Sequence, residues 1–234
     1  MPFNASQIKS TAQAGDEGIK TLVYGRSGVG KTPLLATAPY PFIISGEKGL
    51  LSLKRCNPPL PYGEFTNQAQ LIDIFKWCAS SHEARQFYTL GLDSVSEAAE
   101  VLLADLQKKY NNDGRKVYPA LEAETMALLR AFRDLAWKSV VVIGKEEYDK
   151  DESGLMVYRP LLPGKKLPQA IPYLFDETFR MLVGKDQNGQ DMRYLRTRLS
   201  GTEIARDRSG MLNEFEPANL TYVFSKILGI SQGR

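Results

Sequence analysis

Cysteine and histidine are scarce in this chain, which has two cysteines and one histidine among its 234 residues. Cys56 and Cys78 stand far apart, without the closely spaced pairs that zinc sites use. This pattern argues against a zinc site or a disulfide framework and suits a reducing cytoplasm. His82 lies in a polar connection, so catalysis by a histidine-based triad is also excluded.

Long apolar runs and a strong net charge are missing as well. No run approaches the roughly 18 apolar residues of a membrane span, and residues 1–18 are polar, without the apolar core of a signal peptide. The net charge of +3 permits a nucleic-acid partner without requiring one. We therefore expect a flexible leader at residues 1–18, a single domain at residues 19–234, and no membrane association.

Short β-prone runs alternate with helical patterns along most of the chain, which predicts a mostly parallel sheet with helices on both faces. Strands are expected at residues 21–24, 42–45, 87–92 and 139–143, and helices at 31–38, 68–80, 94–109 and 120–137. In the last third, two β-prone runs at 178–184 and 192–199 flank a turn at 186–189, which predicts a C-terminal β-hairpin. Residues 217–228 favour a closing helix, and the expected fold class is α/β.

The segment after the first expected strand contains the complete Walker A pattern, G-x-x-x-x-G-K-T. Its glycines allow main-chain N–H groups to point at phosphate oxygens, and the N-terminus of the next helix adds a partial positive charge. Lys31 is expected to bridge the terminal phosphates and Thr32 to ligate Mg²⁺, with ATP as the nucleotide. The expected nucleotide-binding residues here are Gly25, Arg26, Ser27, Gly28, Val29, Gly30, Lys31, Thr32 and Pro33.

Two acidic residues follow expected strands. Asp93 comes directly after the third strand and is the candidate second ligand of Mg²⁺, in a Walker B role; a simple helix-capping aspartate is the alternative. Glu47 lies just beyond the second strand. Because strand ends gather on the ligand side of such a sheet, Glu47 is the candidate general base. The alternative is a surface turn in which Glu47 pairs with Lys48.

With these residues in place, the chain resembles the RecA-like branch of P-loop ATPases, in which a catalytic glutamate follows the second strand and an Asp-Ser pair ends the Walker B strand. It more closely resembles the phage nucleotide-binding proteins that include the ATPase-type single-strand annealing proteins of the Sak group, over about residues 20–228. The resemblance is carried by residues 24–25, 47–50, 93–94 and 205–210. It implies a RecA-like P-loop core that anneals or recombines single-stranded DNA during phage replication, in the host cytoplasm.

The stretch after the fourth strand departs from the RecA-like pattern. RecA-like proteins often place a glutamine or histidine there to sense the γ-phosphate, whereas this chain has Lys145 and Glu146. We therefore expect Lys145 to contact phosphate directly. The chain is also expected to be a minimal core without a separate DNA-binding domain.

Basic residues interleaved with tyrosines occupy the two segments where RecA-like proteins touch single strands. One follows the 94–109 helix and the other follows the 139–143 strand. This mixture suits a groove for the DNA backbone with stacking platforms, while lysines at a helix end and packed tyrosines are the alternative. The expected DNA-binding residues are Lys108, Lys109, Arg115, Lys116, Lys150, Arg159, Lys165 and Lys166.

Arg206 and Arg208 flank Asp207 before a Ser-Gly turn. Turns of this kind in RecA-like assemblies reach the γ-phosphate of a neighbouring subunit, so the pair is a candidate arginine finger. It implies a homo-oligomer, a ring or filament with ATP at the subunit interfaces. A surface ion pair with Asp207 or Glu203 is the alternative.

These observations favour an ATP-binding, single-stranded-DNA annealing or recombination protein with weak Mg²⁺-dependent ATPase activity. Its expected partners are single-stranded DNA, other copies of the chain and, as a candidate, a single-strand-binding protein. Three other functions stay open: a RecA-like helicase or DNA motor, a small-molecule or nucleoside kinase, and a non-hydrolytic, ATP-gated assembly protein.

Overall fold

The computed structural model describes residues 18–47 and 49–230, so the expected leader, apart from its last residue, and Lys48 lie outside the described residues. Ten strands form one sheet in the order β10-β8-β7-β1-β5-β4-β2-β3, with β6 paired to β5 and β9 paired to β7. The strands are β1 (Lys20–Gly25), β2 (Pro41–Ser45), β3 (Tyr62–Glu64), β4 (Thr89–Asp93), β5 (Ser139–Lys150), β6 (Met156–Leu161), β7 (Glu177–Lys185), β8 (Asp191–Arg196), β9 (Arg206–Asp207) and β10 (Phe215–Pro217).

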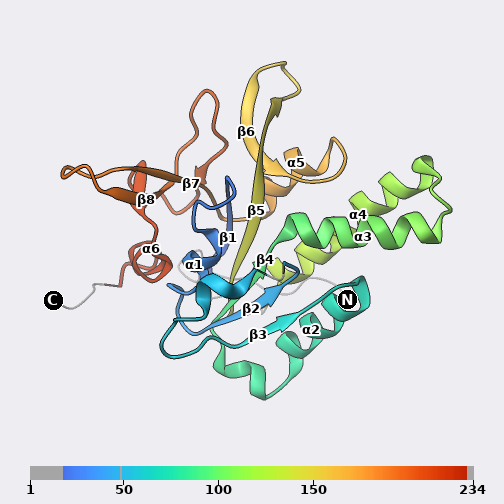
Figure 1. Cartoon of the computed structure of the whole chain (residues 1–234), viewed down its shortest axis with the longest axis horizontal. Helices are drawn as coiled ribbons and strands as arrows, with labels where there is room; N and C mark the ends of the chain where they lie inside the picture. Colours follow the sequence, from blue (N-terminus) through green and yellow to red (C-terminus); the bar gives the residue numbers. More distant parts are fainter. Residues whose placement is uncertain (1–17, 48, 231–234) are drawn as a thin grey trace, which may run out of the picture.

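Helices cover both faces of this sheet (Figure 1). The α-helices are α1 (Lys31–Leu35), α2 (Gln68–Ser80), α3 (Val95–Lys109), α4 (Gly114–Arg133), α5 (Leu167–Ala170) and α6 (Leu220–Ile227). Three 3₁₀ helices join them, η3 (Leu50–Leu53), η4 (Glu83–Gln86) and η5 (Ile171–Leu174). Among the described residues, no helix is both long and apolar enough to span a membrane.

Six strands that are neighbours in the sheet are parallel, in the order β7-β1-β5-β4-β2-β3. Their side chains alternate between two hydrophobic cores. Leu22 and Val140 belong to the core under α2, α3 and α4. Val23 and Val141, the next residue along each strand, belong to the core under α1 and α6. Burial on both faces explains why these strands are almost continuously apolar in sequence.

The structure confirms the predicted α/β class, with a mostly parallel sheet flanked by helices and a C-terminal β-hairpin formed by β7 and β8. Parallel strands bring their carboxyl ends to one edge, so the residues that follow β1, β2 and β4 meet there. Asp93 pairs with Ser45 in the register of β4 and β2, which places Glu47 near Asp93. This edge carries the candidate site.

The predicted start of one helix and the predicted end of one strand are wrong. The expected helix at 120–137 begins at Gly114, because the side chain of Asp113 accepts a hydrogen bond from the N–H of Arg115 (3.1 Å) and caps the helix there. The strand expected at 139–143 continues to Lys150 and pairs with β6, and Figure 1 shows the β5–β6 hairpin rising beyond the sheet. Stacking of Tyr148 on Tyr158, with ring centroids 4.4 Å apart, supports that hairpin.

Candidate functional site

The loop between β1 and α1 needs its glycines for both conformation and packing. Gly28 and Gly30 have φ of +78° and +103°, in the region that glycine adopts without strain. A Cβ on Gly30 would lie 2.7 Å from Nε of Arg193, and a Cβ on Gly25 would lie 2.8 Å from the carbonyl oxygen of Met181. The loop therefore lies directly against the β7–β8 hairpin.

Lys31 is the central cation of this loop. Its Nζ donates hydrogen bonds to the carbonyl oxygens of Gly25 (2.7 Å) and Arg26 (2.9 Å). Burial lowers the pKa of Lys31, and the negative charges of Asp93 and Glu47 oppose that shift. A partly buried ammonium in this loop is well placed to bind an anion.

Thr32 and Asp93 come together from α1 and the end of β4. The hydroxyl of Thr32 donates a hydrogen bond to Oδ2 of Asp93 at 2.6 Å. Burial raises the pKa of Asp93, and the hydrogen bond from Thr32 opposes that shift. A hydroxyl and one carboxylate fit Mg²⁺, which takes one or two protein oxygens together with phosphate oxygens and water. Among the described residues, no group of three histidines, cysteines or acidic residues could hold a metal by itself.

Glu47 lies beside this pair, just after β2. Its Oε1 accepts a hydrogen bond from the hydroxyl of Ser94 at 3.1 Å, and Nζ of Lys145 lies 3.3 Å away. The main chain supports the same arrangement, since the N–H of Gly46 donates to the carbonyl of Asp93 at 2.8 Å. The structure thus brings the candidate base next to the candidate metal ligand.

Lys145 lies within this cluster because β5 runs between β1 and β4. Its Nζ also lies 3.2 Å from Oε2 of Glu97, in the first turn of α3. Partial burial opposes the charged form, but the hydrogen bonds and charges of Glu97 and Glu47 outweigh it and raise the pKa of Lys145. Lys145 is therefore a permanent cation between two carboxylates, and Glu97 is a neighbour of the site.

Comparison with known proteins agrees with this geometry. A family profile described as an AAA domain matches residues 17–209. The chain belongs to this AAA domain family. AAA domains are P-loop NTPases, and the fold of this one is a mostly parallel α/β sheet with a C-terminal β-hairpin.

Among solved structures, this AAA domain is similar to the flagellar accessory protein FlaH from Methanocaldococcus jannaschii. The two chains are 11% identical, with a TM-score of 0.38, and the alignment covers 77% of this chain and 78% of that one. A search of curated proteins gave no match.

Other charged residues of this AAA domain reach the phosphate loop from distant positions in the sequence. Nε of Arg26 lies 3.5 Å from Glu146 of β5, whose buried side chain in turn accepts a 2.7 Å hydrogen bond from Arg180 of β7. Arg193 of β8 donates from Nε to the carbonyl of Val29 at 2.9 Å. These contacts were not expected, because no local sequence pattern links the loop to strands that lie 120 to 164 residues away.

The structure corrects the placement of Arg206. Its guanidinium donates to the carbonyl oxygens of Pro172 (2.8 Å) and Phe175, both in its own chain. Burial lowers the pKa of Arg206, and the charge of Arg208 adds to that shift. Arg208 instead remains more than half exposed and pairs with Asp176 at 3.0 Å. Of the two expected finger residues, only Arg208 presents its side chain at the surface.

Both arginines also lie far from the phosphate loop of their own subunit. β9 pairs with Glu177 and Thr178, which in turn pair with Thr21 and Leu22 near the start of β1. The loop follows the other end of β1. Within one subunit, Arg206 and Arg208 are therefore at the edge of the sheet opposite the candidate site.

The expected DNA-binding residues divide into exposed and buried groups. Arg159 is only 5% exposed, and its guanidinium donates hydrogen bonds to Glu147 and Asp149, both at 2.7 Å. Those two carboxylates engage the guanidinium within the chain, and its contact with DNA stays a prediction. Exposed basic residues remain on the α3–α4 helical hairpin, the tip of β5 and the segment after β6: Lys108, Lys109, Arg115, Lys116, Lys150, Lys165 and Lys166.

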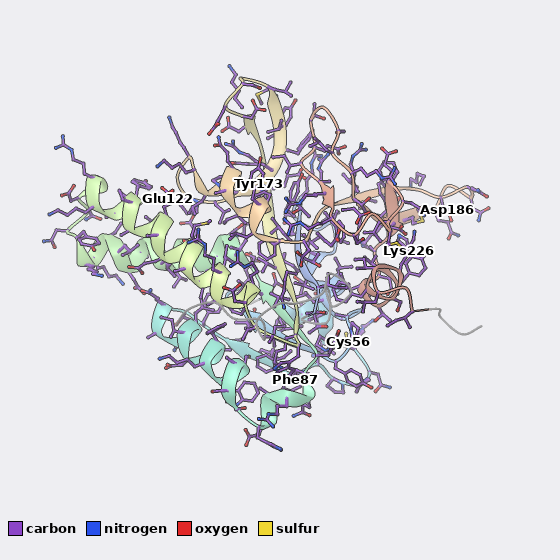
Figure 2. The ribbon with its side chains drawn as sticks, turned by 180° about the vertical axis from the view of Figure 1, so that it is seen from behind. Cys56, Phe87, Glu122, Tyr173, Asp186 and Lys226 are labelled. Carbon is purple, nitrogen blue, oxygen red and sulfur yellow. The ribbon has the colours of Figure 1, made fainter. Side chains whose placement is uncertain are left out.

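A groove joins the two segments that carry these basic residues. It has a volume of about 540 Å³ and is lined by Tyr118 and Glu122 of α4 together with Gly164, Lys165 and Lys166. Nζ of Lys166 lies 3.6 Å from Glu122, which Figure 2 marks on α4. Tyr118 is half exposed in this groove. The structure therefore places an aromatic ring from one expected DNA segment beside lysines from the other.

Proposed function

We propose that this AAA domain is a Mg²⁺-dependent ATPase that acts on single-stranded DNA, as in annealing or recombination during phage replication. The observation that carries the ATPase part is the meeting of Lys31, the Thr32–Asp93 pair and Glu47 at one edge of the sheet. These are the cation, the metal ligands and the base that phosphoryl transfer to water requires.

The proposed chemistry is in-line attack of water on the γ-phosphorus. The new bond joins the water oxygen to phosphorus while the bond to the β–γ bridging oxygen breaks, and the carboxylate of Glu47 accepts the water proton. Lys31 balances negative charge on the phosphates, and Ser94 and Lys145 hold Glu47 in place. Thr32 and Asp93 would hold Mg²⁺, which supplies electrostatic stabilisation of the phosphate oxygens.

The groove beside α4 supports the DNA part of the proposal. A single strand needs cations for its phosphates and an aromatic face for its bases. Lys165 and Lys166 supply the cations, and Tyr118 supplies the aromatic face. Exposed Arg115 and Lys116 lie near Tyr118 in the first turns of α4. The resemblance to phage annealing proteins points to the same class of partner.

Phosphate release, measured with and without single-stranded DNA, tests the two parts separately. Wild type should release phosphate in the presence of ATP and Mg²⁺, and Lys31→Ala should not, because the loop loses its cation. Fluorescence anisotropy of a labelled oligonucleotide should show binding that weakens as salt rises. An ATPase that binds no single strand at low salt, with or without ATP, would exclude the DNA role and leave the ATPase role standing.

We also propose that Arg208 completes the site of a neighbouring copy. Mixing two defective proteins tests this directly: Lys31→Ala keeps Arg208 but loses its own site, while Arg208→Ala keeps its site but loses the finger. A mixture should release phosphate faster than either variant alone, because mixed oligomers contain some complete sites. If mixing restores nothing while both variants still assemble with wild type, Arg208 does not act across an interface.

A further inference from the structure

The β7–β8 hairpin forms the rim of the phosphate loop opposite Asp93. In the sheet, β5 and then β4 lie on one side of β1, whereas β7 and then β8 lie on the other. The hairpin approaches closely, since the carbonyl of Met181 leaves no room for a Cβ on Gly25. One rim of the loop therefore carries the Thr32–Asp93 pair, and the other is made by the hairpin (Figure 1).

Arg193 is the cation on this second rim. It lies on β8, opposite Val183 of β7, and donates from Nε to the carbonyl of Val29 at 2.9 Å. Its side chain also rests on Gly30, where an added Cβ would lie 2.7 Å from Nε and 2.9 Å from Cδ. The guanidinium thus reaches the residues whose main chain forms the anion-binding loop.

Arg193 differs from the other cations of the hairpin, whose charges are balanced by carboxylates. Lys185 pairs with Asp191, and Arg196 pairs with Glu203 and Glu214. Among the described residues, Arg193 forms no ion pair, and its side chain is exposed. An arginine has five N–H donors, and the bond to Val29 uses one. The others are available to an acceptor at the loop.

We propose that Arg193 is a second phosphate-binding cation of the loop, supplied by the same subunit. Thr32 and Asp93 mark the metal end of the polyphosphate on the β4 side. Arg193 comes from the opposite side, so it binds the phosphates nearer the nucleoside, which diphosphates and triphosphates share. A guanidinium suits this task because it can donate two parallel hydrogen bonds to one phosphate. The inference rests on nucleotide binding at the loop.

Calorimetric titration with ATP, ADP and inorganic pyrophosphate tests the proposal. Arg193→Met should raise the Kd for all three by about 10- to 100-fold, the loss expected for a charge-assisted hydrogen bond. The control Lys185→Met removes another hairpin cation, which pairs with Asp191 at the turn, and should leave each Kd within about 3-fold of wild type. Unchanged Kd values in Arg193→Met would overturn the proposal.

The three ligands also separate the alternatives. Loss of ATP binding alone would place Arg193 at the γ-phosphate, and loss of nucleotide binding with normal pyrophosphate binding would place it at the nucleoside; either result contradicts the proposal. Wild-type protein that binds none of the ligands would refute nucleotide binding itself. Normal wild-type binding that Arg193→Met leaves intact would refute only the role of Arg193.

A merely structural role for Arg193 predicts a different result. Glutamine can donate an N–H to the carbonyl of Val29 but carries no charge, whereas lysine keeps the charge. We expect Arg193→Lys to retain more affinity for pyrophosphate than Arg193→Gln. If Arg193→Gln binds pyrophosphate as wild type does, the contact with Val29 alone explains the arginine and the proposal fails.

Discussion

Replacing Glu47 by glutamine should stop hydrolysis while leaving the fold and nucleotide binding intact. Glutamine has nearly the same shape and can still accept the hydrogen bond from Ser94, but it cannot take a proton from water. General-base catalysis contributes roughly 10²- to 10⁴-fold, so phosphate release should fall by about that factor. The Kd for ATP should change by less than about 3-fold, because the substitution leaves the contacts that bind ATP in its ground state unchanged.

The stability change can be estimated from the ion pair that the substitution removes. Glu47 and Lys145 lie 3.3 Å apart with side chains 39% and 43% exposed. Such solvent-screened pairs contribute about 0–1 kcal/mol, and Lys145 keeps its second partner, Glu97, at 3.2 Å. The free energy of unfolding should therefore change by less than about 1 kcal/mol, as measured by urea denaturation.

Glu97→Gln is the matched control for Glu47→Gln. It removes the other carboxylate from Lys145 and leaves the Glu47 carboxylate in place. Phosphate release by this variant should stay within about 10-fold of wild type. If Glu47→Gln hydrolyses ATP at the wild-type rate, or if both variants lose the same activity, then Glu47 is not the base and the cluster acts only through its charge.

Three further outcomes are expected. Burial and a neighbouring carboxylate raise the pKa of Glu177 from 4.5 to about 8, so the folded state holds a proton that the unfolded state releases. Stability should therefore fall as pH rises from about 4.5 to about 8, and thermal denaturation of Glu177→Gln should show a flatter dependence. Replacing Lys165 and Lys166 together by alanine should reduce the slope of log K against log salt for single-stranded DNA by up to about 1.4, roughly 0.7 per lost phosphate contact; exposed Lys76 on α2, changed to alanine, is the control and should leave the slope unchanged. Thr32→Val should weaken the Mg²⁺ dependence of ATP affinity in calorimetry, because one of two protein ligands of the metal is lost without a change in shape.

Local sequence patterns predicted the parts of the site that depend on short segments. The Walker A glycines and Lys31 lie in one loop, and neighbouring residues are enough to recognise a strand that ends at Asp93 and the helix that follows it. The C-terminal hairpin was predicted for the same reason, since its turn and its alternating strands are local features. The ends of α4 and β5 were wrong, because the Asp113 cap and the pairing of β5 with β6 outweighed the local pattern.

What the sequence by itself determined about this protein is its phosphate loop, the neighbouring residues Asp93 and Glu47, and its α/β class.

 Those features depend on residue types at short spacings and on the rule that parallel strands end at one edge. The tertiary structure alone decided that Arg193 and Glu146 reach the loop, that Arg206 turns inward, and that Tyr118 shares a groove with Lys165. The physical reason is the order of the strands: it brings together side chains up to 164 residues apart, and no local preference records which strands become neighbours.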